Sequence, residues 1–263
     1  MDMEVEAGSD RKSQLRVVRI THSIARHWLI FFILLFGIFN VLPFFAPVAM
    51  RLGWTSGGEA IYTIYSTMCH QMAQRSFFFF GSKAMYNLDE LPVTLAGNAS
   101  DMWTLRYFLG NETLGWKVAW SDRMVYMYGS IWMGAVIYAL ISRTRALKPI
   151  PLWLFILLMM PMIFDGITHL FSDVNGLMGG FRYDNRWLAE LTNNSFPVSF
   201  YRGDALGSFN SWIRFFSGVS FGLGVVGLAF PFLDREFRRT ERLLEEKLDH
   251  YYTQLKPTAL KME

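Results

Sequence analysis

Four stretches of the chain are apolar over about the length that crosses a lipid bilayer. A bilayer core of about 30 Å requires roughly 20 apolar residues in helical conformation. The stretches cover residues 28–50, 124–141, 152–171 and 212–232. The first is uncharged and longer than the roughly 7–15 apolar residues of a cleaved signal peptide, so we expect it to remain as an anchor. The pattern predicts an all-α integral membrane protein built as a four-helix bundle.

Two prolines interrupt the first apolar stretch. Pro43 and Pro47 lie in its second half. Proline lacks a backbone N–H and clashes with the carbonyl four residues earlier. We therefore expect the first span to kink or end near these residues.

Basic residues cluster at three boundaries of the spans. They precede the first span, separate the second from the third and follow the fourth. The clusters are Arg11, Lys12, Arg16, Arg19 and Arg26; Arg143, Arg145 and Lys148; and Arg235, Arg238, Arg239 and Arg242. Four spans place these three boundaries on one side, and basic flanks favour the cytoplasm. We expect a multi-pass protein of the bacterial inner membrane, with both termini in the cytoplasm.

This topology divides the chain into three parts. Residues 1–27 form a basic cytoplasmic segment, and residues 28–233 form the membrane domain with outer loops 51–123 and 172–211. Residues 234–263 form a cytoplasmic amphipathic helix and tail, because leucine and tyrosine recur at helical spacing opposite a charged face. This helix is expected to lie on the membrane surface or to pack on a partner. The alternative is a solvated extension of the fourth span.

A shorter amphipathic segment follows the first span. On a helix over residues 59–75, Tyr62, Tyr65, Cys69 and Met72 fall on one stripe and polar residues on another. The segment is too short to cross, so we expect an amphipathic helix on the outer face, followed by four phenylalanines in lipid or in the core.

The chain's one cysteine lies on this segment, beside His70. A single cysteine excludes an intrachain disulfide. Neighbouring residues diverge by about 100° around a helix, so Cys69 and His70 are poorly placed to bind one metal ion. The spacing favours Cys69 as a small buried residue over a ligand or nucleophile, and the sequence indicates no metal site.

The third span carries Asp165 and His169, one helical turn apart on one face. A charged residue within a membrane is expensive and normally faces the bundle interior with a partner. Arginines near the outer ends of other segments supply the candidates: Arg75, Arg123, Arg182, Arg186 and Arg214. These residues predict a polar site at the outer mouth of the bundle. The alternative is a structural salt bridge at Asp165, with arginines that only anchor the spans at the interface.

Composition and motifs exclude several function classes. Hydrophobic residues make up 52% of the chain and aromatic residues 17%, whereas the net charge is only +3, and no basic run indicates a nucleic-acid partner. The glycine-rich segment at residues 222–227 follows no strand. It is therefore suited to close helix packing rather than to binding a nucleotide.

Four segments together resemble a known family. `MCHQMAQRSFFFFG` is similar to the Cys-His-Gln…Arg-Ser-Phe signature of a bacterial and archaeal family of predicted membrane proteins, domain of unknown function two thousand and eighty-five. `KVAWSDRMVYMYGS`, `PMIFDGITHLF` and `FRYDNRWLAELT` resemble its later segments, so that the likeness spans roughly residues 61–218. The matching residues are Cys69, His70, Gln71, Arg75, Ser76, Arg123, Asp165, Gly166, Arg182 and Asn185.

The chain departs from the family pattern at several positions. Ser121 stands where the family has a second cysteine, so a two-cysteine redox or metal site cannot form. Met124 replaces an aspartate and His169 replaces a glutamine. The family supplies no reaction, and neither a reaction nor a cofactor is assigned.

These observations leave three hypotheses. In the first, the outer site binds or acts on a small anionic or lipid-like molecule. Arg75, Arg123 and Arg182 would hold the anion, and Asp165 would transfer protons with His169 or His70. Further lining would come from the other matching residues: Cys69, Gln71 and Asn185.

The second hypothesis is a non-catalytic accessory subunit of a respiratory or photosynthetic membrane complex, with membrane lipid and other subunits as partners. The aromatic content and the lack of a catalytic motif motivate it. The third is a transporter, which four spans in one chain disfavour.

Overall fold

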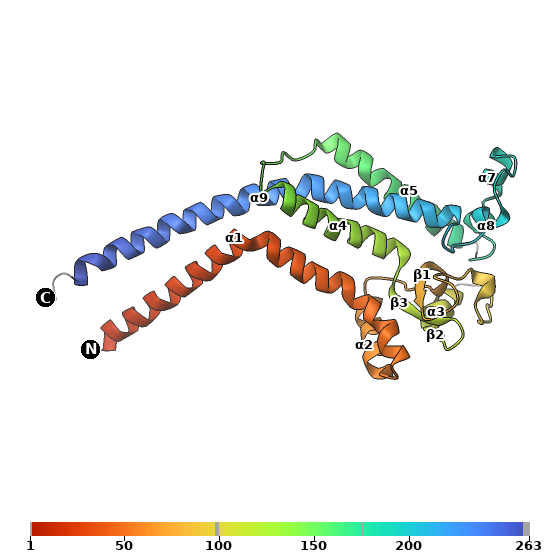
Figure 1. Ribbon diagram of the computed structural model, residues 1–263, viewed down its shortest axis with the longest axis horizontal. Helices are drawn as coiled ribbons and strands as arrows, with labels where there is room; N and C mark the ends of the chain where they lie inside the picture. The colour runs from red at the N-terminus through yellow and green to blue at the C-terminus, as the bar shows by residue number, and fades with distance from the viewer. Residues whose placement is uncertain (1, 98–99, 175, 260–263) are drawn as a thin grey trace.

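Four long helices run side by side in the computed structural model, which describes residues 2–97, 100–174 and 176–259. Within these residues, four helices are long and apolar enough to cross a membrane. They are α1 (Asp2–Arg51), α4 (Asp122–Ile141), α5 (Leu152–Val174) and α9 (Phe209–Ala259). Both termini lie at one end of the bundle, the terminal side, and the long loops lie at the other, the loop side (Figure 1). The predicted all-α membrane class is confirmed.

The C-terminal amphipathic segment is not a separate helix. The fourth span continues without interruption to Ala259, and α1 also extends far beyond its apolar stretch on the terminal side. The two extensions contact each other, with Trp28 stacked on Phe237 at 5.1 Å between ring centroids. The sequence left an extension of the fourth span open as the alternative to a helix on the membrane surface or on a partner, and the structure has this extension. The segment extends the fourth span, and its apolar residues are partly covered by α1 rather than by lipid.

The bend of α1 lies at His27, not at the prolines. His27 has non-helical backbone angles (φ −114°, ψ 19°), whereas Pro43 and Pro47 lie inside a helix that continues to Arg51. Pro43 cannot donate to the carbonyl of Phe39, but the Tyr65 hydroxyl donates to that oxygen at 2.8 Å. A neighbouring side chain thus replaces the lost hydrogen bond, and the helix passes the proline.

Glycines bring α4 and α9 into close contact. Ser130 of α4 donates its hydroxyl to the carbonyl of Gly218 at 3.1 Å. A Cβ atom at Gly222 would lie 1.9 Å from the Ser130 hydroxyl and 2.9 Å from the Ile131 nitrogen. The short segment of small residues in the fourth span therefore serves helix packing, as the sequence predicted.

Substitution of Gly222 tests this packing. We expect Gly222→Ala to destabilise the bundle by about 1–3 kcal/mol, because backbone and side-chain atoms of α4 must shift. Gly129→Ala is the matched control, since a Cβ at Gly129 meets nothing within 4 Å. Thermal unfolding in mild detergent compares the two, and an equal loss of stability in both variants would contradict the packing argument.

The loop side carries a folded cap, which we define as residues 52–97, 100–121 and 176–208. Its helical elements are α2 (Thr55–Ser66), η1 (Ala73–Arg75), η2 (Leu88–Glu90), α3 (Asp101–Tyr107), α6 (Phe181–Asp184), α7 (Arg186–Leu191) and α8 (Val198–Tyr201). The strands β1 (Ser76–Phe79), β2 (Gly110–Asn111) and β3 (Gly115–Ser121) form an antiparallel sheet in the order β1-β3-β2.

The helix predicted over residues 59–75 ends early. Helix α2 stops at Ser66, and Gln71 adopts the left-handed backbone conformation (φ 52°), which a helix cannot include. The turn is fixed by Lys117 of β3, whose buried ammonium donates to the Gln71 and Arg106 carbonyls at 2.6 Å each. His70 and Arg75 therefore lie on a turn and a 3-10 helix. Three of the four phenylalanines that follow lie in strand β1, where Phe78 is buried in the cap, whereas Phe80 follows the strand and is exposed.

Candidate functional site

Asp165 lies buried on α5 between two arginines. Its Oδ2 accepts from Arg123 Nη2 at 2.7 Å, and its Oδ1 accepts from Arg182 Nη2 at 2.9 Å. His169, one turn further along α5, has its Nε2 3.2 Å from the same Arg182 nitrogen. A guanidinium only donates, so His169 Nε2 accepts and the imidazole proton lies on Nδ1. Arg123, Asp165, His169 and Arg182 form what we name the Asp165 cluster.

Arg182 is held in place on all sides. It donates through Nη1 to the Thr168 hydroxyl at 2.7 Å and through Nε to Asn210 Oδ1 at 2.9 Å. Asn185 has a left-handed backbone (φ 45°) and donates to the Arg182 carbonyl at 3.0 Å. Burial lowers the pKa of Arg182, while the Asp165 charge opposes that change. The role of Asn185 in this arrangement is to position Arg182.

A second group of charges adjoins the first. Arg75 binds both oxygens of Asp173 at 2.9 and 3.0 Å, and its Nε donates to Asp204 at 2.9 Å. Arg214 donates to Asp204 at 2.6 Å and to Asp122 at 2.7 Å. These five residues form what we name the Asp204 cluster.

Charge pairing sets the protonation of this second cluster. Burial opposes the ionised carboxylate of Asp204, but Arg75 and Arg214 outweigh it, and the pKa of Asp204 is lowered. Burial likewise opposes the charged form of Arg75, yet Asp204 and Asp173 raise its pKa.

The two clusters carry opposite net charge. In the Asp165 cluster, two guanidinium groups share one carboxylate, which leaves one positive charge beside a neutral imidazole. In the Asp204 cluster, two guanidinium groups face three carboxylates, which leaves one negative charge. The excess positive charge lies beside Asp165 of α5, where both Arg123 and Arg182 pair with this carboxylate.

A cavity of about 750 Å³ borders the Asp165 cluster. Its polar wall comprises His70, Arg75, Arg123, His169 and Asp173, and its apolar wall comprises Met72, Met102, Leu170, Val174 and Leu177. Among the described residues, Arg123 Nε and His169 Nδ1 are buried donors without a hydrogen-bond partner. Unpaired buried donors are uncommon in folded proteins and call for an acceptor such as water or a ligand.

The other predicted site residues have different environments. His70 is exposed at the cavity and makes no hydrogen bond to Asp165 in the described structure. Arg75 pairs with Asp173 and Asp204 rather than with Asp165. Arg186 is exposed and pairs with Asp184, so it is not a partner of Asp165.

Cys69 and Gln71 border a smaller cavity of about 100 Å³, which adjoins the larger one and shares His70, Met72, Arg75 and Arg123 with it. The Gln71 side chain donates to the carbonyls of Tyr62 and Ala119, which fixes the turn. Cys69 is buried, as its spacing predicted, and its Sγ lies 3.4 Å from the Ser121 hydroxyl. Ser121 is the position that the resemblance aligned with a second cysteine, and the fold brings it into contact with Cys69.

The sequence reasoning missed Asp122, Asp173, Asp204 and Asn210. One signal for Asp173 was present, because it follows His169 by four residues and continues the face of α5 that carries Asp165. Asp122 was visible as the neighbour of Arg123. Asp204 and Asn210 carried no comparable signal, since their positions depend on how the second loop folds.

The structure combines four candidate membrane spans with a buried charge network on the loop side. Residues 112–228 match a family model described as predicted membrane protein, DUF2085, which confirms the resemblance over these residues. The match includes the charged residues of both clusters except Arg75, and it begins after the Cys69–Phe80 segment.

One curated relative is the uncharacterized protein MJ1492 of Methanocaldococcus jannaschii. It is 29% identical over 140 residues, which cover 51% of this chain and 68% of the relative. No solved structure matches the chain. These similarities supply no activity, and the site must be interpreted from its geometry.

Proposed function

We propose that the chain binds an anionic amphiphile, with the acidic head group at the Asp165 cluster and the apolar part along the cavity. The observation that carries the proposal is the division of this cavity into a polar wall, which includes Arg123, and an apolar wall. Two residues of the polar wall, Arg123 and His169, each have a buried donor without a hydrogen-bond partner, Nε and Nδ1.

The excess positive charge favours an anion. A phosphate or carboxylate head near Arg123 and His169 would neutralise the charge that Asp165 leaves uncompensated. Charge-assisted hydrogen bonds to such a group are stronger than hydrogen bonds between neutral groups. A guanidinium presents a planar fork of donors that suits a phosphate or carboxylate. Asp165 then acts as a positioning residue that orients Arg123 and Arg182.

The apolar wall suits an acyl or isoprenoid chain. Leu170 and Val174 of α5 are exposed at the molecular surface, where a membrane-spanning helix faces lipid. An amphiphile could therefore keep its tail in the bilayer while its head reaches the cluster. With the termini in the cytoplasm, as the basic flanks predict, the ligand would come from the outer leaflet.

Proton transfer by Asp165 with His169 or His70 stays a prediction. Both oxygens of Asp165 are occupied by guanidinium donors, which favours a role in positioning. The role as an accessory subunit of a larger membrane complex also stays a prediction.

Arg123→Lys tests the proposed ligand. Lysine keeps the positive charge opposite Asp165 but removes the planar fork and the Nε donor. We expect binding of phosphatidylglycerol to weaken about tenfold, because a hydrogen bond to a charged group contributes about 1.5–3 kcal/mol. Native mass spectrometry of the detergent-solubilised protein measures this, with phosphatidylcholine as the zwitterionic comparison.

Arg51→Lys is the matched control. Arg51 is an exposed arginine on the loop side that pairs with Glu112. Equal phosphatidylglycerol affinity in wild type, Arg51→Lys and Arg123→Lys would refute a head-group site at Arg123. So would equal affinity of the wild type for the two lipids.

A further inference from the structure

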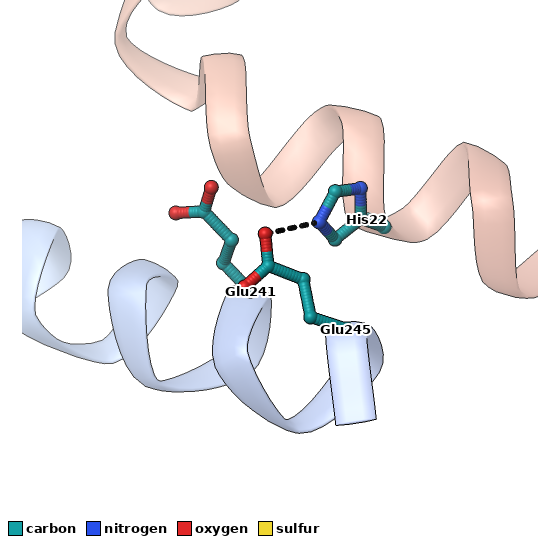
Figure 2. A group of neighbouring side chains, drawn as sticks. All are labelled: His22, Glu241 and Glu245. Carbon is teal, nitrogen blue, oxygen red and sulfur yellow. Dashed lines mark hydrogen bonds and ion pairs between the residues drawn. The ribbon is translucent and has the colours of Figure 1, made fainter. Parts of the chain in front are cut away.

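A cluster of metal-ligating side chains lies on the terminal side, at the opposite end of the bundle from the Asp165 cluster. It joins His22 of α1 to Glu241 and Glu245 of α9. Figure 2 shows all three side chains pointing into the space between the two helices. The ligand atoms lie within 4.8 Å of one another, and His22 Nε2 is 3.4 Å from Glu245 Oε1.

The spacing along the chain explains how three ligands reach one point. Glu241 and Glu245 are one helical turn apart, so their carboxylates leave the same face of α9. Tetrahedral bonds of about 2.0–2.1 Å place ligand atoms roughly 3.3–3.4 Å apart, close to the separation of His22 and Glu245. Glu241 offers the third ligand oxygen within the 4.8 Å that separates the ligand atoms at most.

Contacts on both sides of the cluster fix the register of the two helices. Arg19 donates to the Tyr252 hydroxyl on the side nearer the termini. Trp28 stacks on Phe237 on the side nearer the membrane. The ligands are therefore presented by a helix pair that is already aligned, which reduces the entropy lost when a metal ion binds.

The environment is suited to an exchangeable ion. His22 and Glu241 are partly buried and Glu245 is exposed, so water has access to complete the coordination. Arg26 lies 3.9 Å from Glu241 and would give up this contact. Two carboxylates at this spacing repel each other on a helix, and a divalent cation removes that repulsion.

We propose that His22, Glu241 and Glu245 bind a divalent first-row transition metal, with Zn²⁺ as the representative ion. One imidazole with two carboxylates is a donor set for such ions, whereas Mg²⁺ and Ca²⁺ prefer oxygen ligands alone. The bound ion ties the N-terminal helix to the C-terminal helix outside the membrane span. The proposal concerns different residues from the anion site and does not depend on it.

Zinc titration of the full chain tests the site. The protein is purified in mild detergent without a histidine tag, treated with EDTA, and titrated with Zn²⁺ against a fluorescent chelator. We expect one Zn²⁺ per chain, with no competition from millimolar Mg²⁺. His22→Gln and Glu245→Gln each remove one ligand. They should weaken binding by more than the roughly 10–100-fold that follows loss of a hydrogen bond to a ligand.

Glu246→Gln is the matched control. Glu246 is exposed and neighbours Glu245, but it leaves α9 about 100° away from the cluster. It should leave zinc affinity unchanged and should keep the wild-type melting temperature without metal, because Glu246 is exposed. Absence of stoichiometric Zn²⁺ binding would overturn the proposal. So would an affinity that is the same in wild type, His22→Gln and Glu245→Gln.

Discussion

Replacing Asp165 by asparagine should lower the free energy of unfolding by about 3–5 kcal/mol, the usual effect of removing one partner from a buried ion pair. Asparagine keeps the size of the side chain but removes the charge that Arg123 and Arg182 share. Arg123 and Arg182 would then lack the carboxylate that neutralises their charge. Thermal unfolding in mild detergent, followed by tryptophan fluorescence, measures the change.

Asp184→Asn is the matched control for this prediction. Asp184 pairs with Arg186, whose side chain is 82% exposed, so the pair should contribute at most about 1 kcal/mol. A similar melting temperature for Asp165→Asn and Asp184→Asn would show that Asp165 is not the centre of a desolvated cluster.

Replacing Arg214 by glutamine should destabilise the protein about as much as Asp165→Asn. Here the substitution removes the cation and leaves a buried carboxylate without its partner. Arg214 is 1% exposed and donates to Asp122, to the Asp204 carboxylate and to the Asp204 carbonyl. Its loss leaves Asp122 as a buried carboxylate without a cation, whereas Asp204 retains Arg75. We expect a loss of about 3–5 kcal/mol, measured by the same thermal unfolding.

Adding Asp122→Asn shows how much of the stability lost in Arg214→Gln comes from the unpaired charge rather than from lost packing. Arg214→Gln combined with Asp122→Asn removes both members of one pair, so the double variant should be more stable than Arg214→Gln alone. Residues that share a buried ion pair give non-additive changes in a double-mutant cycle. Additive losses would contradict the assignment of Asp122 as the main partner of Arg214.

The membrane spans and the charged centre could be predicted because both follow from the cost of placing polar groups in lipid. Uninterrupted apolar length predicted α4 and α5 to within a few residues. The same cost required a cationic partner for Asp165, and the arginines of neighbouring segments were the available ones. Arg123 and Arg182 lie where that reasoning placed them.

The cap could not be predicted in the same way. The segment Ser76–Phe79 has no alternation that indicates a strand, and its pairing partner β3 follows some forty residues later. The turn at Gln71 depends on the Lys117 ammonium, a contact that no local pattern indicates. The extension of α9 stood only as an alternative for another reason, because apolar length marks the end of a span in lipid but not the end of a helix.

An experimental density map of the protein extracted from its native membrane tests the central claim most directly. The account predicts an acidic head group within hydrogen-bonding distance of Arg123 and His169, with Asp165 between the two arginines and an apolar tail along Leu170 and Val174. A map in which Asp165 points towards lipid, or in which side chains fill the cavity completely, would contradict it.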